Sequence, residues 1–322
     1  MQSISVPRTN KGISIVTPFF NESGGIERFY DAIVSTIDAI PDLKFEVVCV
    51  DDGSVDDSLT RLIELTKRDR RFRVVELSRN FGKEAALTAA IDMARGDAVI
   101  PIDADLQDPP ELIPKLLAEW QKGAEVVLAH RSDRTSDSFV KRMMAQLFYR
   151  FHNRVSSVNL PDNVGDCRLM DRVVVEALKR LPERLRFMKG LFSWVGFKTV
   201  AIDYARARRA TGTTKFSGWK LWNFALEGIT SFSTAPLKIW TYVGALGALV
   251  TLSYAAFIVI RTLIHGVDIP GYASLLVAVL FLGSLQLISV GLLGEYIGRI
   301  YLETKQRPIY LVRRCYGEPD ES

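Results

Sequence analysis

The chain has 322 residues, of which 48% are hydrophobic and 24% charged, and this balance excludes a disordered or low-complexity protein. With 41 basic and 37 acidic residues the formal net charge is +4, so the overall charge does not indicate a nucleic-acid-binding protein. Three widely spaced cysteines, Cys49, Cys167 and Cys315, exclude a disulfide scaffold and a zinc ribbon and fit a reducing compartment. The length suggests two structural units, and we expect no signal peptide because residues 1–12 contain no apolar stretch.

Short apolar runs alternate with helical patterns over the first 130 residues. The runs predict strands at residues 13–17, 45–50, 73–77, 98–102 and 125–129. The patterns between them predict helices at about 25–40, 57–70, 83–94 and 111–122. Strands that alternate with helices form a mostly parallel sheet, which binds ligands beyond the carboxyl ends of its strands. We therefore predict an α/β fold with its functional site at that edge.

Polar and acidic residues follow the predicted strands at this edge. They occupy positions 18–22, 51–54, 80–83 and 103–105. The sequence has no GxGxxG after the first strand, no GxxxxGK[ST] phosphate-binding loop and no GxSxG nucleophile elbow. Its three histidines lack the spacing of metal ligands. The chemistry that remains is that of carboxylates.

Asp103 and Asp105 stand two residues apart, directly after the fourth predicted strand. Their carboxylates, together with the amide oxygen of Gln107, can hold a hard divalent cation. Mg²⁺ and Mn²⁺ prefer oxygen ligands of this kind and commonly share them with substrate phosphates. The alternative is a simple turn before Pro109 and Pro110. The position at a strand end favours the metal site.

Two stretches without charge, residues 239–260 and 273–294, account for the positive mean hydropathy of +0.11. At ~1.5 Å per residue each stretch is ~33 Å long, enough to cross a hydrocarbon core of ~30 Å. The short linker at 261–271 predicts a hairpin of two transmembrane helices, at about 237–262 and 272–296. The alternative is a pair of buried core helices in a soluble domain.

Basic residues gather on one side of this predicted hairpin. Six precede the first span and five follow the second, whereas the linker contains only Arg261. By the positive-inside rule, the preceding domain and both termini face the cytoplasm. The expected segments of this multi-pass protein are a cytoplasmic domain (1–213), a juxtamembrane amphipathic helix region (214–235), the hairpin (236–297) and a cytoplasmic tail (298–322).

Two other stretches combine basic and apolar side chains. Residues 204–226 contain five basic residues and no acidic one. These cations suit lipid headgroups or a substrate phosphate, and both roles can hold together. In residues 139–155 apolar side chains recur every four positions, which fits either a helix that touches the membrane or ordinary core packing.

Four motifs together resemble the family-2 glycosyltransferases with the GT-A fold: PFFNE at 18–22, DDGSVD at 51–56, RNFGKE at 79–84 and DADLQDPPE at 103–111. Within that family the chain is similar to the polyprenyl-phosphate glycosyltransferases, a group that includes dolichol-phosphate mannose synthase. The later motifs GDCRLMDR at 165–172, FMKGLFSWVG at 187–196 and LLGEYIGRIYLETKQRP at 292–308 look like those of the bactoprenol glucosyltransferases of bacterial O-antigen modification. The likeness covers nearly the whole chain.

The resemblance implies a role for each matching residue. The nucleotide-sugar donor would be held by Pro18, Phe20, Asn21, Glu22, Val50, Asp52, Ser54, Lys83, Asp103 and Ala104. The metal, Mg²⁺ or Mn²⁺, would be bound by Asp103, Asp105 and Gln107. The donor diphosphate and the lipid phosphate would be clamped by Arg131, Arg209 and Lys215. The catalytic residues would be Asp166, Arg131 and Arg168.

The resemblance puts Asp166 near the acceptor, where it is a candidate general base. A phosphate monoester loses its second proton at a pKa of ~6, so the acceptor is largely a dianion at neutral pH and needs little deprotonation. An ordinary aspartate, with a pKa of ~3.9, is a weaker base than that phosphate. We therefore expect Asp166 to orient Arg168 or a sugar hydroxyl. A helix-capping aspartate without a catalytic role is the alternative.

The implied reaction is an inverting glycosyl transfer at the cytoplasmic leaflet of a bacterial inner membrane. A UDP-sugar, with UDP-glucose the expected donor, would give its sugar to undecaprenyl (bactoprenol) phosphate and release UDP. Another UDP-sugar or GDP-mannose is an alternative donor, and a membrane-anchored nucleotide-sugar sensor is the non-catalytic alternative. A processive polysaccharide synthase would carry a QxxRW motif and many more spans. The family also implies a homotetramer, and we expect no nucleic-acid partner.

Overall fold

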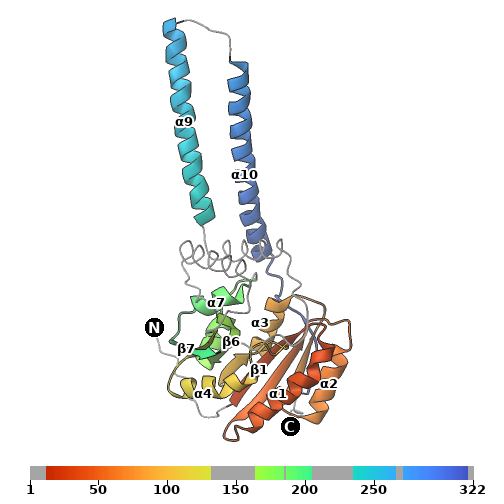
Figure 1. The fold of residues 1–322 in the computed structure, drawn as a ribbon. Helices are drawn as coiled ribbons and strands as arrows, with labels where there is room; N and C mark the ends of the chain where they lie inside the picture. The colour runs from red at the N-terminus through yellow and green to blue at the C-terminus, as the bar shows by residue number, and fades with distance from the viewer. Residues whose placement is uncertain (1–11, 132–163, 185, 205–234, 266–270, 318–322) are drawn as a thin grey trace.

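The computed structural model describes residues 12–131, 164–184, 186–204, 235–265 and 271–317. The predicted helix at 139–155 and nearly all of the juxtamembrane region at 214–235 lie outside these residues, as do Arg209 and Lys215. The described residues up to 204, together with a strand from the C-terminal end, build one mixed sheet with helices on both faces (Figure 1).

Eight strands form this sheet within the described residues, in the order β7-β5-β6-β4-β1-β2-β3-β8. They are β1 (Gly12–Phe19), β2 (Lys44–Asp51), β3 (Phe72–Leu77), β4 (Ala98–Pro101), β5 (Val126–Arg131), β6 (Val164–Asp171), β7 (Thr199–Tyr204) and β8 (Val312–Tyr316). β6 is antiparallel to β4 and β5, and β8 is antiparallel to β3. The remaining neighbours are parallel. The predicted α/β fold with a mostly parallel sheet is thus confirmed, and its five predicted strands are β1 to β5.

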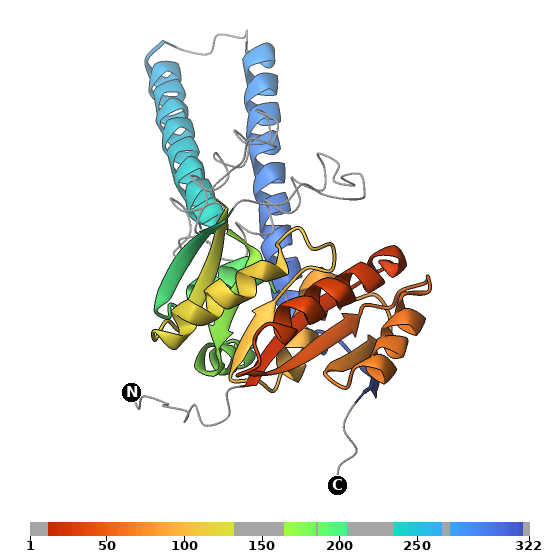
Figure 2. The ribbon, with the colours of Figure 1, turned by 60° about the horizontal axis from the view of Figure 1, so that its bottom comes forward.

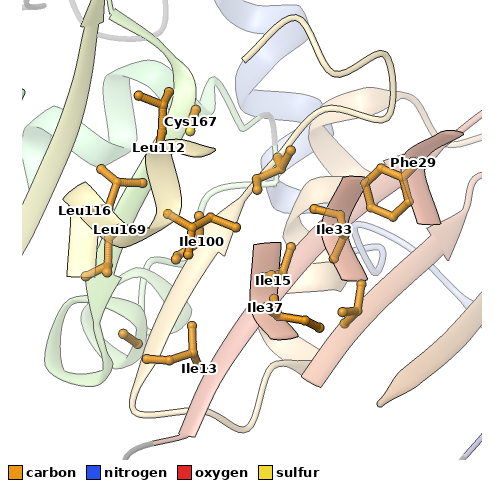
Figure 3. Close-up of a cluster of buried hydrophobic side chains, with 14 of the residues drawn as sticks. Ile13, Ile15, Phe29, Ile33, Ile37, Ile100, Leu112, Leu116, Cys167 and Leu169 are labelled. Carbon is orange, nitrogen blue, oxygen red and sulfur yellow. The ribbon is translucent and has the colours of Figure 1, made fainter. Parts of the chain in front are cut away.

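Helices cover both faces of the sheet. They are α1 (Ile26–Asp38), α2 (Ser58–Arg68), α3 (Lys83–Met93), α4 (Ile113–Gln121), α6 (Arg172–Lys179) and α7 (Met188–Trp194), with short 3-10 turns η1 (Ser23–Gly25) and η2 (Pro110–Leu112). Side chains alternate between the faces along each strand. In β1, Ile13 and Ile15 pack toward Ile33 of α1, as Figure 3 shows, whereas Val16 belongs to the cluster with Ala86 of α3 on the other face.

Two long helices, α9 (Ala235–His265) and α10 (Tyr272–Thr304), lie side by side and leave the sheet on the same side (Figures 1 and 2). Among the described residues, one helical segment, Phe281–Thr304, is long and apolar enough to cross a membrane. Large apolar side chains on both helices are exposed, among them Leu246 and Phe281. This exposure argues against the alternative of buried core helices, and the two-span hairpin stays a prediction.

Part of the segment expected to be a cytoplasmic tail, at 298–322, belongs to the sheet. α10 continues to Thr304, and the chain then returns to the sheet, where β8 pairs with β3. The Tyr310 hydroxyl donates a hydrogen bond of 2.9 Å to Asp92 of α3. The sequence VRRCY of β8 has too few apolar residues to reveal a strand by alternation. These residues are therefore part of the domain and not a separate tail.

Candidate active site

The loops after β1 and β2 are joined by hydrogen bonds at the carboxyl edge of the sheet. The Asn21 backbone N–H donates to Ser54 Oγ at 3.0 Å, and the Val55 N–H donates to Asn21 Oδ1 at 2.9 Å. Asn21 has a φ of 54°, in the left-handed region that asparagine adopts more readily than most residues. The structure thus brings together Asn21 and Ser54, two of the residues expected to hold the donor.

Asp52 connects these loops to the loop after β3. Its buried carboxylate accepts the Phe81 N–H at 2.7 Å and the Gly82 N–H at 2.9 Å. Burial raises the pKa of Asp52, and these two N–H donors oppose the rise. Gly53 has a φ of 67°, and a Cβ atom there would lie 2.5 Å from the carbonyl carbon of Arg79. The three loops therefore form one closely fitted wall.

The other residues expected to hold the donor differ in their exposure. Phe20 and Glu22 are exposed beside this wall, and Pro18 is half-buried. Ala104 is partly buried and packs against the core. Val50 is fully buried in the core, so its side chain is a packing group and does not reach the edge.

Lys83, the first residue of α3, links carboxylates from two strands. Its Nζ donates to Asp103, which follows β4, with distances of 2.9 and 3.0 Å to the two oxygens, and to Asp166 Oδ2 of β6 at 2.8 Å. Burial of Lys83 acts to lower its pKa, but the two carboxylates outweigh burial and raise it. Lys83 is therefore a permanent cation between two of the acids predicted to be functional.

The two acids bound by Lys83 differ in their proton affinity. Burial acts to raise the pKa of Asp166, but Lys83, Lys189 and Arg168 outweigh it and lower the pKa to about 2. The pKa of Asp103 is raised by burial and by the charges of Asp166 and Asp105, against the opposing effect of Lys83. Asp166 is thus ionised at neutral pH, whereas a further cation beside Asp103 would favour the ionised form of that carboxyl group.

The turn after β4 holds the residues predicted to bind a metal. The Gln107 side-chain amide donates to Asp105 Oδ2 at 2.6 Å, and its backbone N–H donates to Oδ1 at 3.2 Å. The described residues contain no group of three His, Cys, Asp or Glu side chains that could hold a metal ion. Mg²⁺ is usually bound by one or two carboxylates and completes its shell with water and substrate phosphates. Asp103 and Asp105 fit a divalent ion bound together with a diphosphate.

Asp108 anchors this turn and was not singled out from the sequence. Its carboxylate is buried and accepts a hydrogen bond from the hydroxyl of Tyr204, the last residue of β7. Asp108 lies within the motif at 103–111, but the motif alone does not reveal a contact with Tyr204. The bond ties the turn that carries Asp103 and Asp105 to the strand that leads into the basic stretch after residue 204.

Arg168 is buried and is engaged within the protein. Its guanidinium donates to the backbone carbonyls of Gly165 at 2.9 Å and Asp166 at 3.3 Å, and it lies 4.0 Å from the centre of the Phe192 ring. Burial lowers the pKa of Arg168 to about 10. The carboxylate of Asp166 is hydrogen-bonded to Lys83, whereas Arg168 donates to the backbone carbonyl of Asp166. The role of Asp166 in orienting Arg168 or a sugar hydroxyl stays a prediction.

Three basic residues, Arg131, Arg209 and Lys215, were expected to clamp the phosphates. Among them, the described residues include only the backbone of Arg131. This residue ends β5 and pairs with Tyr204 of β7. The side chain of Arg131 lies outside the described residues, as do Arg209 and Lys215. Their roles therefore stay predictions.

Glu84 is a further acid beside Lys83 that the sequence analysis did not single out. Its Oε2 accepts the backbone N–H of Met188, at the start of α7, at 2.9 Å. Burial raises the pKa of Glu84 to about 7, opposed by the Met188 N–H and assisted by the charge of Asp166. Glu84 thus joins the start of α3 to α7.

Comparison with known proteins identifies the class to which this fold and site belong. Residues 14–179 match the model of glycosyl transferase family 2, and residues 235–300 match that of the GtrB C-terminal hairpin. The protein belongs to glycosyltransferase family 2, and it is a glycosyltransferase. The resemblance inferred from its motifs is confirmed.

Curated relatives match over almost the whole chain. A prophage bactoprenol glucosyl transferase homolog of Escherichia coli is 52% identical, over 94% of this chain and 98% of that one. A prophage-derived bactoprenol glucosyl transferase of Shigella flexneri is 51% identical, over 95% and 99%. Among solved structures, glucosyl-3-phosphoglycerate synthase from Mycobacterium tuberculosis is 23% identical with a TM-score of 0.49, over 69% of this chain and 78% of that one.

Proposed function

We propose that this protein transfers glucose from UDP-glucose to undecaprenyl phosphate, with inversion at the anomeric carbon. The identity of 51–52% to bactoprenol glucosyl transferases over nearly the full length supports the sugar and the acceptor. The observation that carries the proposal is the cluster of Lys83, Asp103, Asp105 and Asp166 at the carboxyl edge, where α/β sheets bind their ligands.

In this reaction a phosphate oxygen of the lipid attacks the anomeric carbon, and the bond from that carbon to the UDP oxygen breaks. Asp103 and Asp105 would hold Mg²⁺ or Mn²⁺, which offsets the charge that develops on the leaving diphosphate. Lys83 keeps Asp166 ionised and fixes it beside the site. Because the acceptor is already largely a dianion, the site has to position it and balance its charge more than deprotonate it.

We also propose that α9 and α10 both cross the membrane and that the domain and both termini are cytoplasmic. β8 follows α10 in the chain and belongs to the same sheet as the strands that precede α9. The chain therefore leaves and re-enters the domain on one side of the membrane, and if α10 crosses once, α9 must cross as well. The match of residues 235–300 to the GtrB C-terminal hairpin supports the same arrangement. A homotetramer remains part of the proposal on family grounds.

The test is transfer by the full-length protein, purified in detergent and given undecaprenyl phosphate with radiolabelled UDP-glucose, UDP-galactose or GDP-mannose. We expect the label to move to the lipid from UDP-glucose and to stay in the nucleotide when a chelator is added. Transfer from another donor instead would correct the sugar. Binding of nucleotide sugars without any release of UDP would favour the sensor and contradict the enzyme.

A further inference from the structure

Helix α7 lies between the acidic cluster and the long helices. In Figure 1 it lies on the side of the domain from which α9 and α10 rise. Its start is held by Glu84, the neighbour of Lys83, and Phe192 packs on Arg168, two residues after Asp166 in the chain. The Arg184 N–H, just before α7, donates to Glu303 near the end of α10 at 2.9 and 3.0 Å. The segment from Arg184 to the end of α7 thus contacts both the start of α3 and the end of α10.

Helix α7 has a buried side and a less buried outer side. Met188, Gly190, Leu191 and Phe192 are buried, which fixes the rotation of the helix. Lys189 and Ser193, four residues apart, share the less buried side. Trp194 is 55% exposed at the end of the helix, and tryptophan favours the headgroup level of a membrane. The packing of these buried neighbours therefore places Lys189 on the less buried side of α7.

Lys189 is a cation of the site that forms no ion pair with a described carboxylate. It lies close enough to Asp166 and Glu84 for its charge to lower the pKa of both. Its ammonium makes no hydrogen bond or ion pair with any described residue. Lys83, by contrast, is held by two carboxylates, and Arg168 is held by carbonyl groups.

An acceptor phosphate needs such a cation. It carries close to two negative charges and must come beside Asp166 and a donor diphosphate, all of which are negative. Of the lysine and arginine side chains that the structure places around Asp166, Lys189 is the one without a partner among the described residues. It also belongs to a helix on the side of the domain from which α9 and α10 rise (Figure 1).

We propose that Lys189 binds the phosphate of the polyprenyl phosphate acceptor and that the outer side of α7 is the acceptor side of the site. The inference rests on the proposed function and adds to it a binding residue that the sequence analysis did not identify. Trp194 then lies where the first isoprene units leave the phosphate for the bilayer.

The test compares Lys189→Met, which keeps most of the side-chain length but removes the charge, with Lys189→Arg. The matched control is Lys198→Met, since Lys198 is an exposed lysine at the amino end of β7 whose ammonium also has no partner among the described residues. We expect Lys189→Met to raise the KM for undecaprenyl phosphate about ten-fold or more, the effect of losing a charged hydrogen bond. The KM for UDP-glucose should stay within about two-fold, and Lys189→Arg should recover most of the loss.

A second readout does not depend on turnover. Undecaprenyl phosphate should raise the Tm of the detergent-solubilised wild type more than undecaprenol or phosphatidylglycerol does, and Lys189→Met should lose this difference. An unchanged lipid KM in Lys189→Met, or a rise in the donor KM alone, would overturn the inference while wild-type transfer upheld the proposed function. An equal response to phosphatidylglycerol would identify Lys189 as a general headgroup contact and would also overturn it. If the wild type itself failed to use undecaprenyl phosphate, both proposals would fall.

Discussion

Lys83 donates a hydrogen bond of 2.8 Å to Asp166, and so joins the first residue of α3 to β6 across 83 positions of sequence. The same ammonium binds Asp103 at 2.9 Å. One side chain therefore holds the acid predicted to ligate the metal and the acid predicted to face the acceptor. This contact decides how Asp166 can act, because a carboxylate paired with a lysine gives up its proton readily.

The first prediction concerns the pH dependence of Asp166→Asn. Against the effect of burial, the charges of Lys83, Lys189 and Arg168 lower the pKa of Asp166 to about 2, so the residue is ionised throughout the working range and is a weak base for proton abstraction. We expect the variant to lose rate by a factor that stays nearly constant between about pH 6 and 9, measured as kcat/KM for the lipid. Steep recovery of the variant above about pH 7 would restore the general base.

The second prediction concerns the metal. Asp105→Ala should abolish transfer, and Asp103→Ala should reduce it less severely, because the charge on the departing diphosphate then lacks its cation. Binding of Mn²⁺, followed by calorimetry with UDP present, should weaken in both variants. Asp42→Ala serves as the control because Asp42 is exposed on a loop and has no hydrogen bond or ion pair with any described residue. Full activity of Asp105→Ala, or of the wild type in excess chelator, would contradict the metal role.

The third prediction concerns stability and Glu84. Its pKa is raised by burial to about 7, so its ionisation opposes folding, and the stability gained from the protonated form is lost as the pH rises from about 4.3 through 7. Glu84→Gln keeps an oxygen to accept the Met188 N–H and removes the ionisation. The Tm of the variant should therefore exceed that of the wild type by an amount that grows between about pH 5 and 8. A constant difference would show that Glu84 does not titrate in this range.

The fourth prediction concerns topology. A cysteine introduced at Gly271, the N-cap of α10, should react with an impermeant thiol reagent added outside intact cells, whereas Thr304→Cys should react only after lysis. The unmodified protein is the control, since Cys49 and Cys167 are buried and Cys315 is partly exposed on the side proposed to be cytoplasmic. Labelling at 304 without labelling at 271 would reverse the proposed orientation.

The sequence predicted the sheet well where each strand carried its own signal. The apolar runs that became β1 and β2 end at Phe19 and Asp51, which are paired in the parallel register, so the polar residues that follow both strands lie at one edge. β6, β7 and β8 were not predicted. The segments GDCRLMD of β6 and VRRCY of β8 mix polar and apolar residues and owe their pairing to the strands beside them.

The sequence identified most residues of the candidate site, but it did not predict which of them contact one another. Asp103 and Asp166 were singled out by motif, but their common partner Lys83 was assigned only to the donor, since pairing across 83 residues leaves no trace in spacing. Glu84, Asp108 and Lys189 lie inside the motifs at 79–84, 103–111 and 187–196, but the resemblance assigned no role to them. Their importance follows from burial and from what lies beside them, which only the folded chain determines.

The pairing of β8 with β3 also bears on how the protein is made. A ribosome produces α9 and α10 before it produces β8, so β3 remains an open edge of the sheet while the proposed membrane hairpin is being synthesised. Exposed strand edges are sites of unwanted association. The domain can close this edge only after both helices have left the ribosome. Completion of the sheet would therefore be coupled to insertion of the proposed membrane hairpin.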